Sequence, residues 1–146
     1  MIDHWLVFFG PAPPGWWSWC LDARFQHVAA AGYDYDTDTW AFVDPGRAGT
    51  MIELARGPAA DHRLGAMAHA AAPHVLRVRA RACRRIAPPM LSCTAAIKAL
   101  LGLRSRALVP AGLYRDLLRQ GAEIVEVPGF ELLSDTRTGP GSCAAA

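Results

Sequence analysis

The sequence predicts an α+β fold in which one antiparallel sheet of about four to six strands packs against two or three helices. Short apolar segments separated by Gly-, Pro- and Asp-rich turns fill most of the first half of the chain, and two segments with helical spacing follow. The 146 residues are 52% hydrophobic, which is enough for one domain with its own core. We expect this domain to span residues 1–133 and residues 134–146 to form a flexible tail.

A β-hairpin is predicted in the first third of the chain. Residues 24–31 and 39–43 have the composition of strands and lie on either side of a polar turn at 32–38. The Asp-Pro-Gly sequence at 44–46 is a turn signal, so we expect the second strand to end there.

Three more strands are predicted outside this hairpin within residues 1–81. Residues 5–9 are an apolar run that ends before a proline-rich segment, and residues 50–55 have the composition of a strand. Residues 57–72 stay ambiguous, because helix-forming residues fill only their second half. Residues 75–81 alternate between apolar side chains and arginines, which predicts a strand buried on one face.

The arginines of this last strand and of the segment after it form a basic edge, namely Arg77, Arg79, Arg81, Arg84 and Arg85. Such an edge either binds an anionic partner or only keeps a solvated sheet edge from aggregating. The sequence alone leaves both interpretations open.

Two helices are predicted in the second half of the chain. The first follows a pair of prolines, has Ser92 as its N-cap and Cys93 in its first turn, and stops at Gly102. Its apolar stripe has i, i+3, i+4 spacing and consists of Ile97, Leu100 and Leu101. Residues 110–121 have the pattern of a second helix that begins with a proline, and residues 124–127 that of a last strand or an extended segment.

Charge and cysteine content argue against several classes of protein. A net charge of +2 is too small to indicate nucleic acid as a partner. No two of the four cysteines have C-x-x-C spacing, and we expect neither a metal nor another cofactor. No segment approaches the roughly 20 apolar residues of a membrane helix. The first residues lack the basic start of a signal peptide. We therefore expect a cytoplasmic or virion-associated protein without a signal peptide.

Cys93 is the first candidate for chemistry. The N-terminus of a helix carries a partial positive charge, which favours the thiolate form of a cysteine placed there. A thiolate is a nucleophile when a base lies nearby. The alternative is a small buried side chain with no chemical role, because cysteine is also a common core residue.

His27 and Asp44 are the candidates for a base and its orienting acid. His27 lies inside an apolar strand, where an imidazole needs a polar partner or a place beside a cleft. Asp44 follows the next strand, so pairing of the two strands would bring the acid close to the histidine. A carboxylate in that position fixes the tautomer of the ring and stabilises its charged form. A backbone-bonded core histidine and a turn-capping aspartate are the alternatives.

These segments together resemble the papain-like cysteine peptidases, in the circularly permuted branch where the histidine precedes the cysteine. The similarity rests on residues 25–28, 40–45 and 92–102 and covers residues 23–120. It implies a permuted NlpC/P60-like domain with Cys93 as nucleophile, His27 as general base and Asp44 as orienter. The chain has no glutamine shortly before Cys93, where papain has its oxyanion-hole residue.

The function that we expect is cysteine-dependent acyl transfer, most simply hydrolysis of a peptide or a peptidoglycan-like amide. Trp19, Trp40 and Ser92 are the substrate-binding candidates, with a packing layer as the alternative for the tryptophans. One rival is a non-catalytic binding or assembly module of the same fold, such as a phage-related accessory protein. The other is an unrelated α+β domain that binds an anionic partner at its arginine edge.

Overall fold

The computed structural model describes residues 1–11, 21–46, 49–80 and 92–127. The strands are β1 (Ile2–Gly10), β2 (His27–Asp34), β3 (Thr39–Gly46), β4 (Gly49–Ala55), β5 (Val75–Arg79) and β6 (Glu123–Ile124). The helices are α1 (Gly57–Ala71), α2 (Cys93–Leu100) and α3 (Pro110–Arg119). All strand pairs are antiparallel, in the order β4-β3-β2-β1-β5-β6. The predicted α+β class, with one antiparallel sheet and packed helices, is confirmed.

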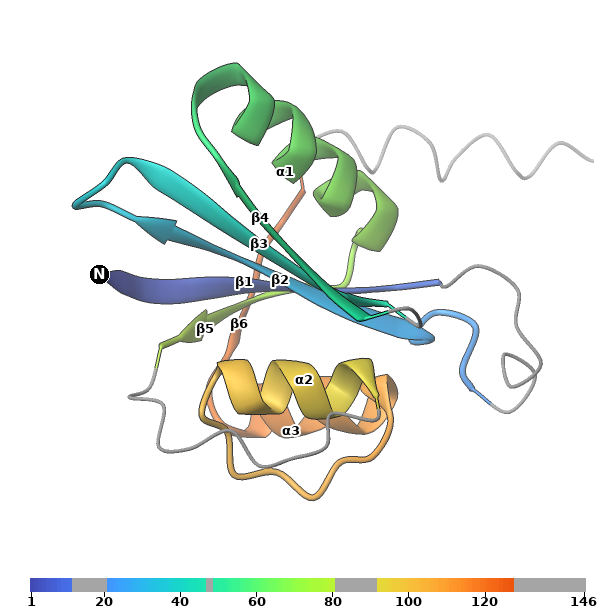
Figure 1. The fold of residues 1–146 in the computed structure, drawn as a ribbon. Coiled ribbons are helices and arrows are strands. Elements are labelled where there is room, and N and C mark those ends of the chain that lie inside the picture. The colour runs from blue at the N-terminus through green and yellow to red at the C-terminus, as the bar shows by residue number, and fades with distance from the viewer. Residues whose placement is uncertain (12–20, 47–48, 81–91, 128–146) are drawn as a thin grey trace, which may run out of the picture.

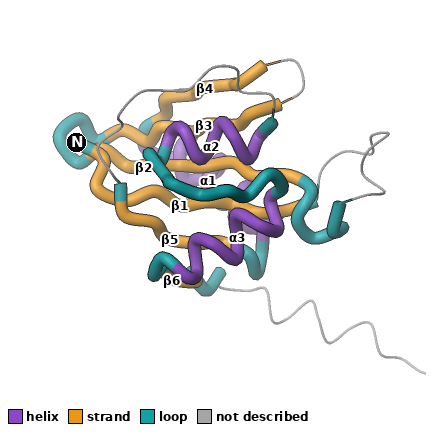
Figure 2. Tube along the Cα trace, turned by 90° about the horizontal axis from the view of Figure 1, so that it is seen from below, coloured by secondary structure: helices purple, strands orange, loops and turns teal. Residues whose placement is uncertain are grey.

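The sheet is the middle of three layers. Helix α1 covers one face, and α2 and α3 cover the other (Figure 1). Seen from below, α2 lies over β2 and β3 while α3 lies on the side of β5 (Figure 2). The central strand β1 is apolar along most of its length because its two faces are both covered.

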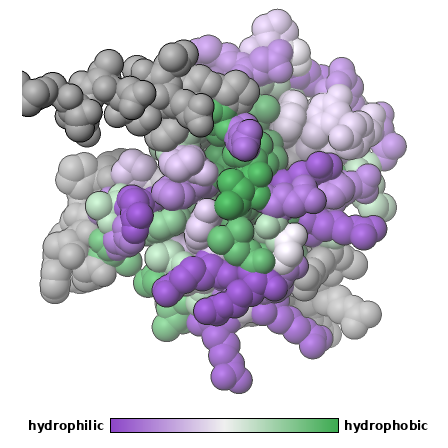
Figure 3. Space-filling model, turned by 180° about the vertical axis from the view of Figure 1, so that it is seen from behind, coloured by the Kyte–Doolittle hydropathy of each residue, from purple (hydrophilic) through white to green (hydrophobic). Residues whose placement is uncertain are grey.

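Each face of the sheet has its own core. Beneath α2 and α3, buried side chains of the sheet pack with Ile97, Leu101, Leu113 and Leu117. On the other face, Phe8, Ala31, Phe42 and Val75 pack with two small residues of α1, Ala60 and Ala71. On the side shown in Figure 3, hydrophilic side chains surround a narrow apolar band. Such a band is ordinary for a globular surface.

Local signals explain why α2 and α3 start where they do. The Ser92 hydroxyl accepts a hydrogen bond from the Ala95 N–H at 3.2 Å, so the predicted N-cap is present. Pro110 opens α3, where its missing N–H is not needed. Both helices turn their buried residues toward the core beneath them, which fixes the orientation of Cys93 at the start of α2.

The boundaries of the hairpin differ from the prediction. β2 begins at His27 and continues to Asp34, so the connection to β3 shortens to residues 35–38. Tyr33 packs against Trp40 across the hairpin, with ring centroids 5.2 Å apart, which extends the pairing toward the turn. β3 continues through Asp44 to Gly46, so the turn expected at 44–46 is wrong. Pairing of these residues with β4 outweighs the local turn signal.

Other segments are resolved or corrected as well. The ambiguous residues 57–72 form α1. The last strand is β6 rather than 124–127, although the Val125 N–H still donates to the Val75 carbonyl at 2.9 Å. β5 ends at Arg79 and has the predicted alternation of buried and exposed residues. Trp16, Trp17 and Trp19, residues 81–85 and the tail at 134–146 lie outside the described residues.

Truncation of a core leucine tests this packing. Leu101 is fully buried at the end of α2, and we expect Leu101→Ala to lower the free energy of unfolding by about 2–5 kcal/mol because it leaves a cavity. Leu108→Ala is the matched control, since Leu108 is 82% exposed. Chemical denaturation measures both variants, and equal losses would contradict the described packing of α2.

Candidate active site

His27 and Asp44 lie at the open end of the β2–β3 hairpin. The two strands pair from Asp34 opposite Thr39 as far as Ala30 opposite Val43, and beyond that point only β4 pairs with β3. His27 is thus at the start of β2, where this strand is paired with β1 but not with β3. Its Nε2 lies 2.7 Å from Oδ1 of Asp44. The structure therefore brings together the predicted base and its predicted acid.

Cys93 is the first residue of α2 and a half-buried, free cysteine. Its side chain is hydrogen-bonded to the His27 side chain, and the backbone N–H groups of Val28 and Thr94 donate to its sulfur. Since Nε2 of His27 faces Asp44, Nδ1 is the ring nitrogen that remains for the sulfur. The result is one hydrogen-bonded series of side chains, Asp44–His27–Cys93, whose members come from β3, β2 and α2.

This hydrogen-bonded series passes from one face of the sheet to the other. Phe42 belongs to the core under α1, so Asp44, two residues further along β3, points to the α1 face. Cys93 packs against the core under α2 on the opposite face. His27 connects the two sides at the place where β2 and β3 have parted.

Electrostatics favour the ionised form of Cys93. Burial of the thiol raises its pKa, but the hydrogen bonds from His27 and from the two backbone N–H groups lower it further than burial raises it. The net result is a Cys93 pKa below the ordinary value. A thiolate is therefore present at lower pH than for an ordinary cysteine.

The imidazole of His27 is affected in the opposite direction. Its hydrogen bond to Cys93 raises the pKa of His27, burial lowers it, and the bond to Asp44 raises it again, so the pKa lies above the ordinary value. The two shifts bring the pKa values of Cys93 and His27 toward each other, which favours coexistence of thiolate and imidazolium as an ion pair. That pair is lost as the pH falls through the lowered pKa of Cys93 or rises through the raised pKa of His27.

The other sequence candidates lie elsewhere or outside the described residues. Trp40 is four residues from Asp44 along β3, about 13 Å at the usual rise of a strand, and stacks on Phe42 under α1. It is not brought beside Cys93. Ser92 is adjacent to Cys93 and caps α2 with its hydroxyl. Trp19 is not among the described residues.

Three groups of the site were not among the sequence candidates. The N–H groups of Val28 and Thr94 contribute through the backbone, which no side-chain pattern reveals. Arg63 extends from α1 to within 3.9 Å of Oδ2 of Asp44. The only signal for it was an arginine within a segment whose structure the sequence left ambiguous.

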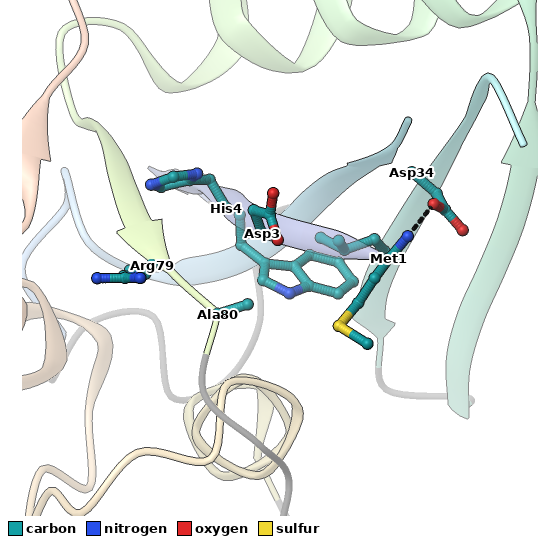
Figure 4. A pocket seen from close by; sticks show the side chains of 8 residues that line it. Met1, Asp3, His4, Asp34, Arg79 and Ala80 are labelled. Carbon is teal, nitrogen blue, oxygen red and sulfur yellow. Dashed lines mark hydrogen bonds and ion pairs between the residues drawn. The ribbon is translucent and has the colours of Figure 1, made fainter. Parts of the chain in front are cut away.

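An open cavity lies away from these residues. It has a volume of about 890 Å³ and is found at the far end of β1 and β2, between Asp34, His4 and Arg79 (Figure 4). Asp34 is opposite Ile2 in β1, whereas His27 is opposite Gly10, so the cavity and Cys93 are at opposite ends of the sheet.

Among the residues that the structure describes, no three His, Cys, Asp or Glu side chains gather in a way that would hold a metal ion. None of the helices within the same ranges has the length and apolar character to cross a membrane.

Comparisons with protein families, with curated proteins and with solved structures find no match to this chain. The chemistry of the site is therefore inferred from its own geometry.

Asp44→Asn tests the electrostatics of the site. The substitution removes the negative charge beside Nε2, so we expect the pKa of His27 to fall. As the pH rises, the imidazolium then loses its proton, and the ion pair is lost, at a lower pH than in the wild type. Histidine ring signals followed by NMR across a pH series measure this shift. Asp61→Asn removes the same charge from an exposed position of α1 and should leave the pKa of His27 unchanged.

Proposed function

We propose that this protein is a cysteine-dependent acyl-transfer enzyme, most simply an amide or peptide hydrolase, that uses Cys93, His27 and Asp44. The observation that carries the proposal is the position of His27, which is hydrogen-bonded to Cys93 on one side and to Asp44 on the other. A nucleophile, a base and an orienting acid in this sequence are the parts that covalent acyl transfer requires.

In the first half of the reaction, the Cys93 thiolate attacks the carbonyl carbon of an amide and forms a carbon–sulfur bond. The imidazolium of His27 then donates its proton to the amide nitrogen, the carbon–nitrogen bond breaks, and an amine leaves. Asp44 keeps Nε2–H of His27 directed at its own oxygen, so that the other ring nitrogen faces the reaction.

In the second half, the acyl group is held on Cys93 as a thioester. Water gives a proton to neutral His27 and attacks the thioester carbonyl, and the Cys93 thiolate leaves. The products are a carboxylic acid and the regenerated thiolate–imidazolium pair. Another nucleophile in place of water would give transfer instead of hydrolysis.

The order of the site residues supports a relation to the permuted papain-like peptidases. His27 and Asp44 precede Cys93 in the chain, they come from neighbouring strands, and Cys93 begins a helix packed on the sheet. We include in the proposal a peptide or peptidoglycan-like amide as substrate and a cytoplasmic or virion-associated setting.

The pH dependence of Cys93 alkylation by iodoacetamide tests this function. We expect the folded protein to label at Cys93 faster at mildly acidic pH than the same chain unfolded in guanidinium, because its thiol ionises at lower pH. His27→Ala should remove most of this advantage, because the imidazole contributes most among the groups that lower the pKa of Cys93. His69→Ala, at an exposed position of α1, is the matched control and should label like wild type.

Hydrolysis is tested with a mixed peptide library and with peptidoglycan fragments, using mass spectrometry to detect products. Wild-type protein should release products that Cys93→Ala does not release, and an acyl adduct should appear on Cys93. A Cys93 that labels no faster in the folded than in the unfolded chain would exclude the catalytic function and favour a binding or assembly module.

A further inference from the structure

Arg63 occupies an unusual position for an arginine. It lies in α1 on the side that faces the sheet, and only 32% of its side chain is exposed. Its Nε is buried and makes no hydrogen bond, and lies 3.5 Å from Oε2 of Glu53. A buried guanidinium nitrogen without a hydrogen bond costs free energy, so packing alone does not account for an arginine at this site.

The register of the sheet explains what the guanidinium meets. Asp44 is paired with Met51, and Glu53 is paired with Phe42, so both carboxylates point to the face that α1 covers. They are diagonal neighbours on adjacent strands, close enough to repel each other. Arg63 lies between them, with one terminal nitrogen 3.9 Å from Oδ2 of Asp44.

The two oxygens of Asp44 therefore have different partners. Oδ1 faces Nε2 of His27 at 2.7 Å, and Oδ2 faces Arg63. The ion pair at Oδ2 favours one plane for the carboxylate, whereas a carboxylate with a partner at a single oxygen rotates more freely about its last side-chain bond.

We propose that Arg63 is a positioning residue for the proposed reaction: it holds the Asp44 carboxylate, against the repulsion of Glu53, in the orientation that directs Oδ1 at His27. Arg63 touches neither Cys93 nor the place where a carbonyl would react, so it acts through Asp44. This role rests on the function proposed above and extends its machinery to the helix on the opposite face of the sheet.

A bystander charge would have the opposite effect on His27 from a positioning residue, and this difference makes the proposal testable. Loss of a nearby positive charge by itself stabilises imidazolium and raises the pKa of His27. Loss of the orientation of Asp44 weakens its hydrogen bond to the ring and lowers that pKa. The charged groups that face His27 are Cys93 of α2 and Asp44 of β3. Arg63 of α1 faces Asp44, and Glu53 of β4 faces Arg63.

The experiment is an NMR titration of the full chain with ring-labelled histidine, in which the His27 signal is assigned by its loss in His27→Ala. We expect Arg63→Gln to lower the pKa of His27 by about half or more of the fall that Asp44→Asn causes. In the double variant, the pKa should fall no further than in Asp44→Asn alone, because Arg63 then has no carboxylate to position.

The control is Arg56→Gln, which removes an arginine at the start of the same helix that is bound to Thr39 Oγ1 instead. It should leave the pKa of His27 unchanged. If Arg63→Gln does not fold, Arg63→Lys keeps the charge but loses the planar set of donors, and it should lower the pKa in the same direction by a smaller amount.

An unchanged pKa of His27 in the Arg63 variants would overturn the proposal in favour of a packing role, and a raised pKa would overturn it in favour of a bystander charge. Failure of the proposed function gives a different result, since His27→Ala would then leave alkylation of Cys93 unaffected in a chain with its own Arg63. If the wild-type protein has the ion pair and Arg63→Gln leaves the pKa of His27 unchanged, only the role of Arg63 is contradicted.

Discussion

The parting of β2 from β3 beyond Ala30 and Val43 is the constraint on which the candidate site depends. β3 stays paired with β4 as far as Gly46, so only β2 separates from it. Pro45 contributes to this end of the hairpin, because it has no N–H to give to a ladder. The separation lets the His27 ring reach Asp44. It also leaves the N–H of Val28 bonded to the sulfur of Cys93 instead of to β3. A hairpin paired to its end would use such backbone groups in the ladder and leave the thiolate with fewer donors.

The ionisation of Cys93 is a balance in which each donor has a different origin. Burial opposes the thiolate, and three hydrogen bonds from His27, Val28 and Thr94 favour it. The two backbone N–H groups are fixed by β2 and α2 and do not titrate. Only the contribution of His27 changes with pH, so the ion pair responds to pH through the imidazole. The backbone donors offset a constant part of the rise in the pKa of Cys93 that burial causes.

Short-range features of the site could be predicted from the sequence, and long-range ones could not. The N-cap at Ser92 and the helix start at Cys93 depend on a few neighbouring residues, and both are present. The contact between His27 and Asp44 was predicted although the strand bounds were wrong, because both residues remain at the same open end of the hairpin. Arg63 could not be predicted, since its place depends on how α1 packs over β3 and β4. The inward side of that helix contains Ala60, Leu64, Met67 and Ala71, and an apolar pattern of this kind gives no signal for the arginine beside it.

The layered fold gives the two ends of the proposed catalytic chain separate supports. Helix α2 sets the position of Cys93 from one face of the sheet, and α1 reaches Asp44 from the other. Helices cover both faces of the sheet (Figure 1). The side chains of His27 and Asp44 are nevertheless 29% and 34% exposed, and they lie at the strand ends where β2 and β3 have parted. In the proposed reaction, a carbonyl group therefore reaches Cys93 along this end of the sheet, with the imidazole between the incoming group and the carboxylate that orients the ring.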